Sequence, residues 1–229
     1  MVSDWSGYRD TVVHGLTGFL VPTYWTRCDS DLVKMGTAFG WLHDHLILGQ
    51  SVAVDLKKLH DCLGQLIDNP DLRNDFAVNS RRRAEEMFSY SAIARQYSAL
   101  WSELGQLVSD SENSREPNFD AASYFDLFGH YASLHLDDQF LLKRTDLDRV
   151  ISDDPYCASG EMRMLKFLDG KLLRDLLNLL NSSGSPLPLG EMVKTEAAKT
   201  SLNQDLVRRH ILWLIKYGYA TPVFPNSNV

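Results

Sequence analysis

The sequence predicts a mostly α-helical protein in which an incomplete α/β unit precedes a small helical domain. The first observation is a glycine-punctuated opening segment that contains one short apolar run typical of a buried strand. The second is a set of apolar residues at helical spacing between residues 55 and 107. The third is a leucine-rich region with the same period after residue 165. We therefore expect a truncated α/β remnant, a group of closing helices and a separate helical unit.

The opening segment predicts a loop, a short helix, a turn and a strand. Residues 3–7 form a polar loop whose glycine occupies a position where other residues are strained, and residues 8–13 allow one or two helical turns. Gly15 and Gly18 bracket a tight turn in which Gly18 takes a positive φ. Phe19–Val21 is typical of a strand in a parallel sheet. Because a strand needs neighbours, we expect its partner strands and a preceding helix to lie upstream of this chain.

Two helices are expected next. Apolar residues from Leu56 to Ile67 recur at helical spacing, Asp55 is suited to cap the N-terminus, and Asn69-Pro70 ends the helix. Residues 71–86 indicate a second helix. Its arginines at 81–83 point in different directions around a helix, so we interpret them as a solvated face rather than a phosphate-binding cluster.

A third helix is expected to begin after Ser89 or Ser91, either of which can cap it. Its apolar residues lie on one face at helical spacing, and we interpret them as part of the core. This stripe consists of Ile93, Tyr97, Leu100, Trp101 and Leu104.

These segments together resemble the nucleotide-sugar-binding half of the group 1 retaining glycosyltransferases, which have the GT-B fold. The matching motifs are Ser3-Asp4-Trp5-Ser6-Gly7-Tyr8-Arg9-Asp10, then Gly15-Leu16-Thr17-Gly18-Phe19-Leu20-Val21-Pro22, and the closing helices at 57–68, 81–90 and 93–104. The motifs occur in the family's order and at its usual spacing, and they cover residues 3–107. The resemblance implies a Rossmann-like unit over residues 1–108.

The family transfers a sugar from a nucleotide-sugar donor to an acceptor with retained anomeric configuration, usually without a protein-bound metal or other cofactor. The resemblance places the acceptor-binding domain, and the paired glutamates that hold the donor, upstream of Ser3. It therefore implies a fragment that is inactive alone and that pairs with a missing N-terminal half. In the family the final helix crosses back to brace the other domain, so the resemblance also predicts an exposed apolar patch on residues 93–104.

The resemblance assigns roles to residues of the opening segment but no catalytic residue. Glycine-rich loops accept anions through their backbone N–H groups, and Arg9 is the expected phosphate neighbour. Asp10, at a helix end, is interpreted as a structural carboxylate rather than an acid or base. The expected donor-loop residues are Ser3, Asp4, Gly7, Tyr8 and Arg9, and the expected structural turn residues are Asp10, Gly15 and Gly18.

Composition limits the remaining classes of function. The formal net charge of −7 and a pI near 5.4 argue against nucleic acid or an anionic membrane as the main partner. No apolar run is long enough for a signal peptide or a membrane span, which predicts a cytoplasmic protein. Cys28, Cys62 and Cys157 are expected to be buried apolar side chains, and His43 and His45 are not expected to bind a metal.

The polar, proline-containing residues 109–117 are predicted to be a linker to a second domain, residues 118–229. Helices near 165–180, 189–197 and 203–217, followed by extended residues 219–224, resemble a winged-helix module. We place Arg208, Arg209 and Lys216 on the exposed side of the last helix. The second domain carries twelve Lys and Arg against fourteen Asp and Glu, which favours a protein partner over DNA. The alternative to a glycosyltransferase fragment is therefore a non-enzymatic interaction or regulatory module.

Overall fold

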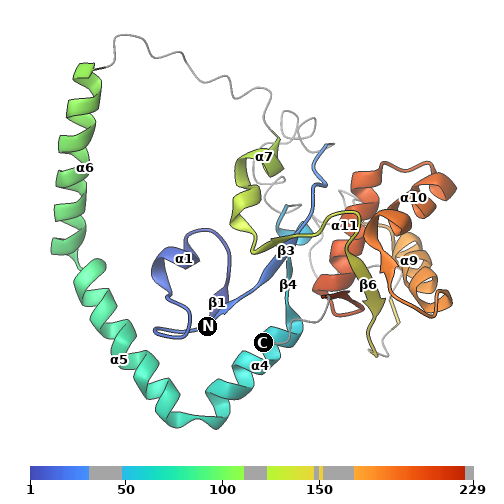
Figure 1. Cartoon of the computed structure of the whole chain (residues 1–229), viewed down its shortest axis with the longest axis horizontal. Helices are drawn as coiled ribbons and strands as arrows, with labels where there is room; N and C mark the ends of the chain where they lie inside the picture. The colour runs from blue at the N-terminus through green and yellow to red at the C-terminus, as the bar shows by residue number, and fades with distance from the viewer. Residues whose placement is uncertain (31–47, 111–122, 147–149, 152–167, 225–229) are drawn as a thin grey trace.

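The structure is a computed structural model that describes residues 1–30, 48–110, 123–146, 150–151 and 168–224. The described part is mostly helical with three small sheets, which confirms the predicted class (Figure 1). The helices are α1 (Tyr8–Thr11), α4 (Leu56–Asp68), α5 (Pro70–Met87), α6 (Tyr90–Asp110), α7 (Tyr124–Phe128), the 3₁₀ helix η1 (Gly129–Tyr131), α9 (Gly170–Ser182), α10 (Leu189–Thr200) and α11 (Gln204–Lys216). The strands are β1 (Val2–Ser3), β2 (Leu20–Val21), β3 (Thr23–Trp25), β4 (Ala53–Val54), β5 (Leu134–His135), β6 (Leu141–Arg144), β7 (Leu187–Pro188) and β8 (Ala220–Val223).

The opening segment folds as the predicted loop, short helix, turn and strand. β2 pairs in parallel with β1, with Val2 opposite Leu20. The expectation that β2 would find its partner strands only upstream was wrong, because β1 supplies a parallel neighbour from the first residues of the chain. β1 could not be predicted from the sequence, because two residues are too few to show periodicity.

Two predictions of backbone strain in this segment were wrong. The residue with positive φ in the loop is Ser6, at 48°, whereas Gly7 has a φ of −62°. In the turn, Gly15 has a φ of 75°, and Gly18 lies outside the left-handed region. The Gly15 N–H donates to the Gly18 carbonyl oxygen at 2.8 Å, so the two glycines do close a tight turn. A Cβ on Gly18 would instead lie 3.3 Å from Cγ1 of Val12.

β3 is the central strand of a second sheet with the order β4-β3-β5. Thr23 pairs antiparallel with Val54, while Tyr24 pairs in parallel with Leu134. Trp25, which is 1% exposed, accepts a further hydrogen bond at its carbonyl oxygen from the N–H of Leu136 at 2.8 Å. The sheet therefore joins the opening segment to residues more than 100 positions later in the chain.

α4, α5 and α6 form an arc that leaves the sheets at β4 and carries α6 away from the rest of the molecule (Figure 1). The cap of α4 at Asp55 and the end of α4 before Asn69 are as predicted, whereas α5 begins at Pro70, one residue before the predicted start. The Asp55 carboxylate accepts from the N–H of Lys58 at 2.8 Å, and Asn69 caps α5 by accepting from the N–H of Leu72 at 3.0 Å. Of the two serines considered for α6, Ser89 is the cap, since its hydroxyl accepts from the N–H of Ala92 at 3.3 Å. Phe19, Cys62 and Phe76 form a small core between this arc and β2.

The apolar stripe of α6 is exposed rather than buried in the core. Tyr97 is 54% exposed, Trp101 67%, and Leu100 and Leu104 46% each. The interpretation of this stripe as core was therefore wrong, and the exposed apolar patch that the glycosyltransferase resemblance predicts was confirmed. Helical periodicity marks the apolar face of a helix, but it does not tell whether the chain itself covers that face.

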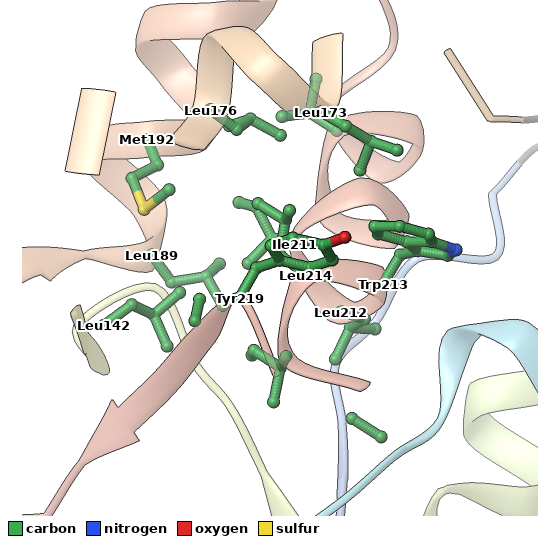
Figure 2. Packing of buried hydrophobic residues seen from close by; sticks show 14 of the residues in the cluster. Leu142, Leu173, Leu176, Leu189, Met192, Ile211, Leu212, Trp213, Leu214 and Tyr219 are labelled. Carbon is green, nitrogen blue, oxygen red and sulfur yellow. The ribbon is translucent and has the colours of Figure 1, made fainter. Parts of the chain in front are cut away.

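The main core lies between α9, α10 and α11 and the third sheet, whose antiparallel order is β7-β6-β8 (Figure 2). Figure 2 shows side chains of α9 and α10 facing those of α11, with Leu142 of β6 and Tyr219 beside them. The Gly218 φ of 79° ends α11 as predicted. Tyr24, Trp25 and Ala53 belong to the same core. The predicted boundary at 109–117 lies largely outside the described residues and stays a prediction.

Candidate binding pocket

The loop between β1 and α1 is held by an ion pair between two predicted site residues, Asp4 in the loop and Arg9 in α1. The Arg9 Nε lies 2.5 Å from Oδ1 of Asp4, and the same guanidinium donates to the Asp4 carbonyl oxygen at 3.3 Å. A third donor of Arg9 reaches the carbonyl oxygen of His130 at 3.1 Å. The guanidinium therefore ties the loop to η1 in this structure.

Asp4 also anchors the loop to the second sheet. Its Oδ2 accepts from the hydroxyl of Ser133 at 2.6 Å, and its carbonyl oxygen accepts from Thr23 Oγ1 at 2.8 Å. Partial burial would raise the pKa of the Asp4 carboxyl, but the hydrogen bonds from Arg9 and Ser133 outweigh it and hold the pKa below its usual value. Asp4 is therefore ionised at neutral pH and acts as a hydrogen-bond acceptor rather than an acid.

The remaining predicted site residues lie at different places around this loop. Ser3 lines a cavity beside the loop, and Tyr8 is 50% exposed. The Asp10 carbonyl oxygen accepts from the Arg83 guanidinium at 2.6 Å, which joins α1 to α5. Gly7 is exposed at the start of α1. Gly15 and Gly18 close the turn that follows α1 in the chain.

The structure also shows a cavity of about 470 Å³ between the loop and the second sheet. Five of the twelve described residues that line it are aromatic, and Leu48, Val52 and Val54 add aliphatic side chains. The aromatic residues are Trp5 after β1, Trp25 of β3, Tyr124 and Phe128 of α7, and Tyr131 of η1. The Trp5 ring centroid lies 5.7 Å from that of Trp25 and 5.8 Å from that of Tyr131, both edge to face.

Lys216, the last residue of α11, is the only charged side chain among the described residues that line this cavity. Its Nζ donates to the Gly49 carbonyl oxygen at 2.6 Å. Burial lowers the pKa of Lys216, because the ammonium has lost part of its hydration. The cavity therefore combines aromatic walls with one half-buried positive charge.

The predicted exposed basic face on α11 was wrong. Arg209 is 4% exposed and donates to the Cys28 carbonyl oxygen at 2.9 Å. Arg208 pairs with Asp138 at 2.9 Å and with Asp205 at 3.0 Å. Asp205 belongs to α11 itself, but Cys28 and Asp138 come from segments far away in the sequence, so the sequence of α11 alone could not show that its arginines are engaged.

Sequence reasoning also missed the cavity. Trp5 and Trp25 were available as aromatic residues, but nothing in the local pattern shows that they meet residues 124–131. The signal that does exist is the group of aromatic residues between 124 and 131, whose spacing alone indicates only one face of a helix.

Cys28 and Cys62 are buried and free, as predicted, and burial raises the pKa of the Cys28 thiol to about 12. Cys157, His43 and His45 lie outside the described residues. Within the described ranges, no group of three or more His, Cys, Asp or Glu side chains could hold a metal ion. No helix in the part of the chain that the structure describes is both long and apolar enough to cross a membrane.

No protein-family model matches this chain, and no curated protein or solved structure gives a significant match.

Proposed function

We propose that residues 3–107 are the closing part of the nucleotide-sugar-binding domain of a group 1 retaining glycosyltransferase. The parent activity is transfer of a sugar from a nucleotide-sugar donor to an acceptor with retained configuration. Ser3, Asp4, Gly7, Tyr8 and Arg9 would form one wall of the donor site. The proposal assigns no catalytic residue to this chain, so the chain alone is expected to be inactive.

The observation that carries this proposal is the uncovered apolar face of α6. The resemblance predicts that the final helix braces an acceptor-binding domain, and the described residues leave this face without a cover. Figure 1 shows α6 at the end of the arc, away from the three sheets. Neighbouring exposed apolar side chains on one face of a helix are typical of a surface that is covered in the functional assembly.

The order of elements in the opening segment also supports the proposal. Its loop, short helix, glycine turn and parallel strand occur in the order that the resemblance requires. Asp4 and Arg9 fix the loop, so that Gly7 and Tyr8 are presented at the surface beside them. Because the Arg9 guanidinium is engaged by Asp4 and His130, contact with a donor phosphate would require one of these hydrogen bonds to be exchanged.

The test is titration of the whole chain with UDP-glucose and GDP-mannose to millimolar concentration, followed by backbone amide NMR. The expected result is saturable shifts at residues 3–10 that are weakened by Tyr8→Ser. The Tyr90→Ser variant is the matched control, because Tyr90 is an exposed tyrosine (93%) outside the loop. A folded chain whose residues 3–10 do not respond to either donor would refute the donor site.

A second candidate is a non-enzymatic interaction domain in residues 118–229. The specific observation is a three-helix cluster, α9 to α11, flanked by the antiparallel sheet β7-β6-β8, in which β8 directly follows α11. We propose that this arrangement is winged-helix-like, with β6 from upstream as its central strand. Since Arg209 is buried and Arg208 is paired with two aspartates, the domain is proposed to bind protein rather than DNA. Salt-sensitive binding of a random DNA duplex at micromolar concentration would contradict this assignment.

A further inference from the structure

We propose that the cavity beside the opening loop binds a small, flat aromatic molecule that carries a carboxylate or a similar anionic group. This inference is independent of the glycosyltransferase proposal, since it rests on the cavity walls and not on the donor loop's resemblance. It also names a ligand different from a nucleotide-sugar, whose diphosphate would need more positive charge than this cavity offers.

The size and walls of the cavity define the aromatic part of the ligand. About 470 Å³ lies within the range of roughly 300–1,000 Å³ that small-molecule sites occupy. Trp5 stands edge to face against both Trp25 and Tyr131. Phe128 lies 5.5 Å from Tyr131 between ring centroids, so the aromatic wall continues from the loop to α7. A flat ring can pack against such a wall edge to face or offset, whereas an alkyl chain would gain only burial.

Lys216 defines the charge of the ligand. Its ammonium is half-buried among apolar side chains, and the hydrogen bond to Gly49 uses one of its three donors. A carboxylate beside it would accept a charge-assisted hydrogen bond and replace part of the hydration that burial removed. A cationic ligand would be repelled by the Lys216 ammonium, and none of the described lining residues carries a negative charge to offset this repulsion.

Each element that contributes to the cavity is fixed by contacts of its own. Trp5 lies in the loop that Asp4 and Arg9 fix, and Trp25 lies in β3, which is paired on both sides. Lys216 is set by the C-terminal end of α11, whose preceding residues are buried in the main core. These supports hold the walls and the charge in place before a ligand arrives, which lowers the entropy cost of binding.

The experiment measures binding of three matched compounds to the whole chain by titration calorimetry: 2-naphthoate, the neutral 2-naphthamide and the cationic 2-naphthylmethylammonium. We expect naphthoate to bind about tenfold more tightly than naphthamide, and the cation to bind most weakly. Lys216→Met should remove the preference for naphthoate while naphthamide affinity stays unchanged. Lys194→Met, an exposed lysine on α10, is the matched control and should keep the preference.

The indole N–H signals in NMR spectra locate the compounds without any substitution. Naphthoate should shift the signals of Trp5 and Trp25 and leave that of Trp101, on the exposed face of α6, unchanged. Shifts at Trp101 alone would mean non-specific binding to an apolar surface and would overturn the proposal. Equal affinities of the wild-type chain for all three compounds, or no naphthoate binding at millimolar concentration, would overturn it as well. If the Lys216→Met chain does not fold, the wild-type affinity order and the indole shifts still decide.

Discussion

The buried imidazole of His210, in the middle of α11, predicts that the fold is sensitive to mild acid. The imidazole is fully buried and accepts at Nε2 from the N–H of Asp169 at 2.7 Å. Its Nδ1 lies 2.7 Å from the Leu206 carbonyl oxygen, so the neutral tautomer with the proton on Nδ1 satisfies both partners. Burial and, to a smaller extent, the positive charge of Arg209 outweigh the opposing hydrogen bond to Leu206 and lower the pKa of His210 to about 4.

The size of the effect follows from the two pKa values. Unfolded chains bind the proton near pH 6.5 and the folded chain only near pH 4, so the unfolded state is favoured as the pH falls through this window. The stabilising contribution is complete above about pH 6.5 and is lost progressively down to pH 4, where the loss reaches about 3 kcal/mol. Between pH 7.5 and pH 5 the loss from this one group is about 2 kcal/mol.

The assay is urea unfolding of the wild type and of His210→Gln at pH 7.5 and pH 5, followed by circular dichroism. Glutamine can both donate and accept a hydrogen bond but does not titrate, so it removes the pH-sensitive contribution. We expect the free energy of unfolding to fall by about 2 kcal/mol more in the wild type than in the variant over this interval. Carboxylates that titrate in both chains cancel in this comparison. Equal pH dependence in the two chains would refute the reasoning.

Three further predictions concern a buried arginine, a turn glycine and the α6 face. Arg209→Ala should cost about 3 kcal/mol in urea unfolding, because the Cys28 carbonyl oxygen loses its donor and the buried stem loses its packing, whereas Arg95→Ala on exposed α6 should stay within about 0.5 kcal/mol. Gly15→Val should cost about 1–3 kcal/mol in thermal unfolding because a φ of 75° strains a branched side chain, and an unchanged Tm would contradict this. Trp101→Glu should leave stability within about 0.5 kcal/mol and reduce the fluorescence of a bound apolar dye, since the side chain is 67% exposed; a large loss of stability would show that the face is covered.

The parts of the fold that sequence could predict are those set by neighbours in the chain. Asp55 and Asn69 cap their helices through contacts three residues away, and Gly218 ends α11 through its own backbone conformation. The parts that failed depend on distant partners. Arg209 looked exposed by charge, yet its partner Cys28 lies in a segment 181 residues earlier.

The candidate site, too, could be predicted only where its residues are close together in the sequence. The loop residues Asp4 and Arg9 were identified from their motif, but their partners Ser133 and His130 lie more than 120 residues later and carry no local signal. The cavity combines Trp5 with α7 and the end of α11, so no single stretch of sequence contains it. Its ligand class therefore depends on tertiary structure and could not be inferred from composition or spacing.

The order of strands in the second sheet also bears on synthesis of the chain. β3 and β4 can pair early, but the parallel partner of β3, at Leu134, follows β4 by about 80 residues that include the α4 to α6 arc. At translation rates of about 5–20 residues per second, this interval lasts roughly 4–16 seconds. During that time one edge of β3 remains open to pairing with other chains. Because β5 lies so far from β3 in the sequence, we expect a chaperone that binds open strand edges to protect the chain at this stage of synthesis.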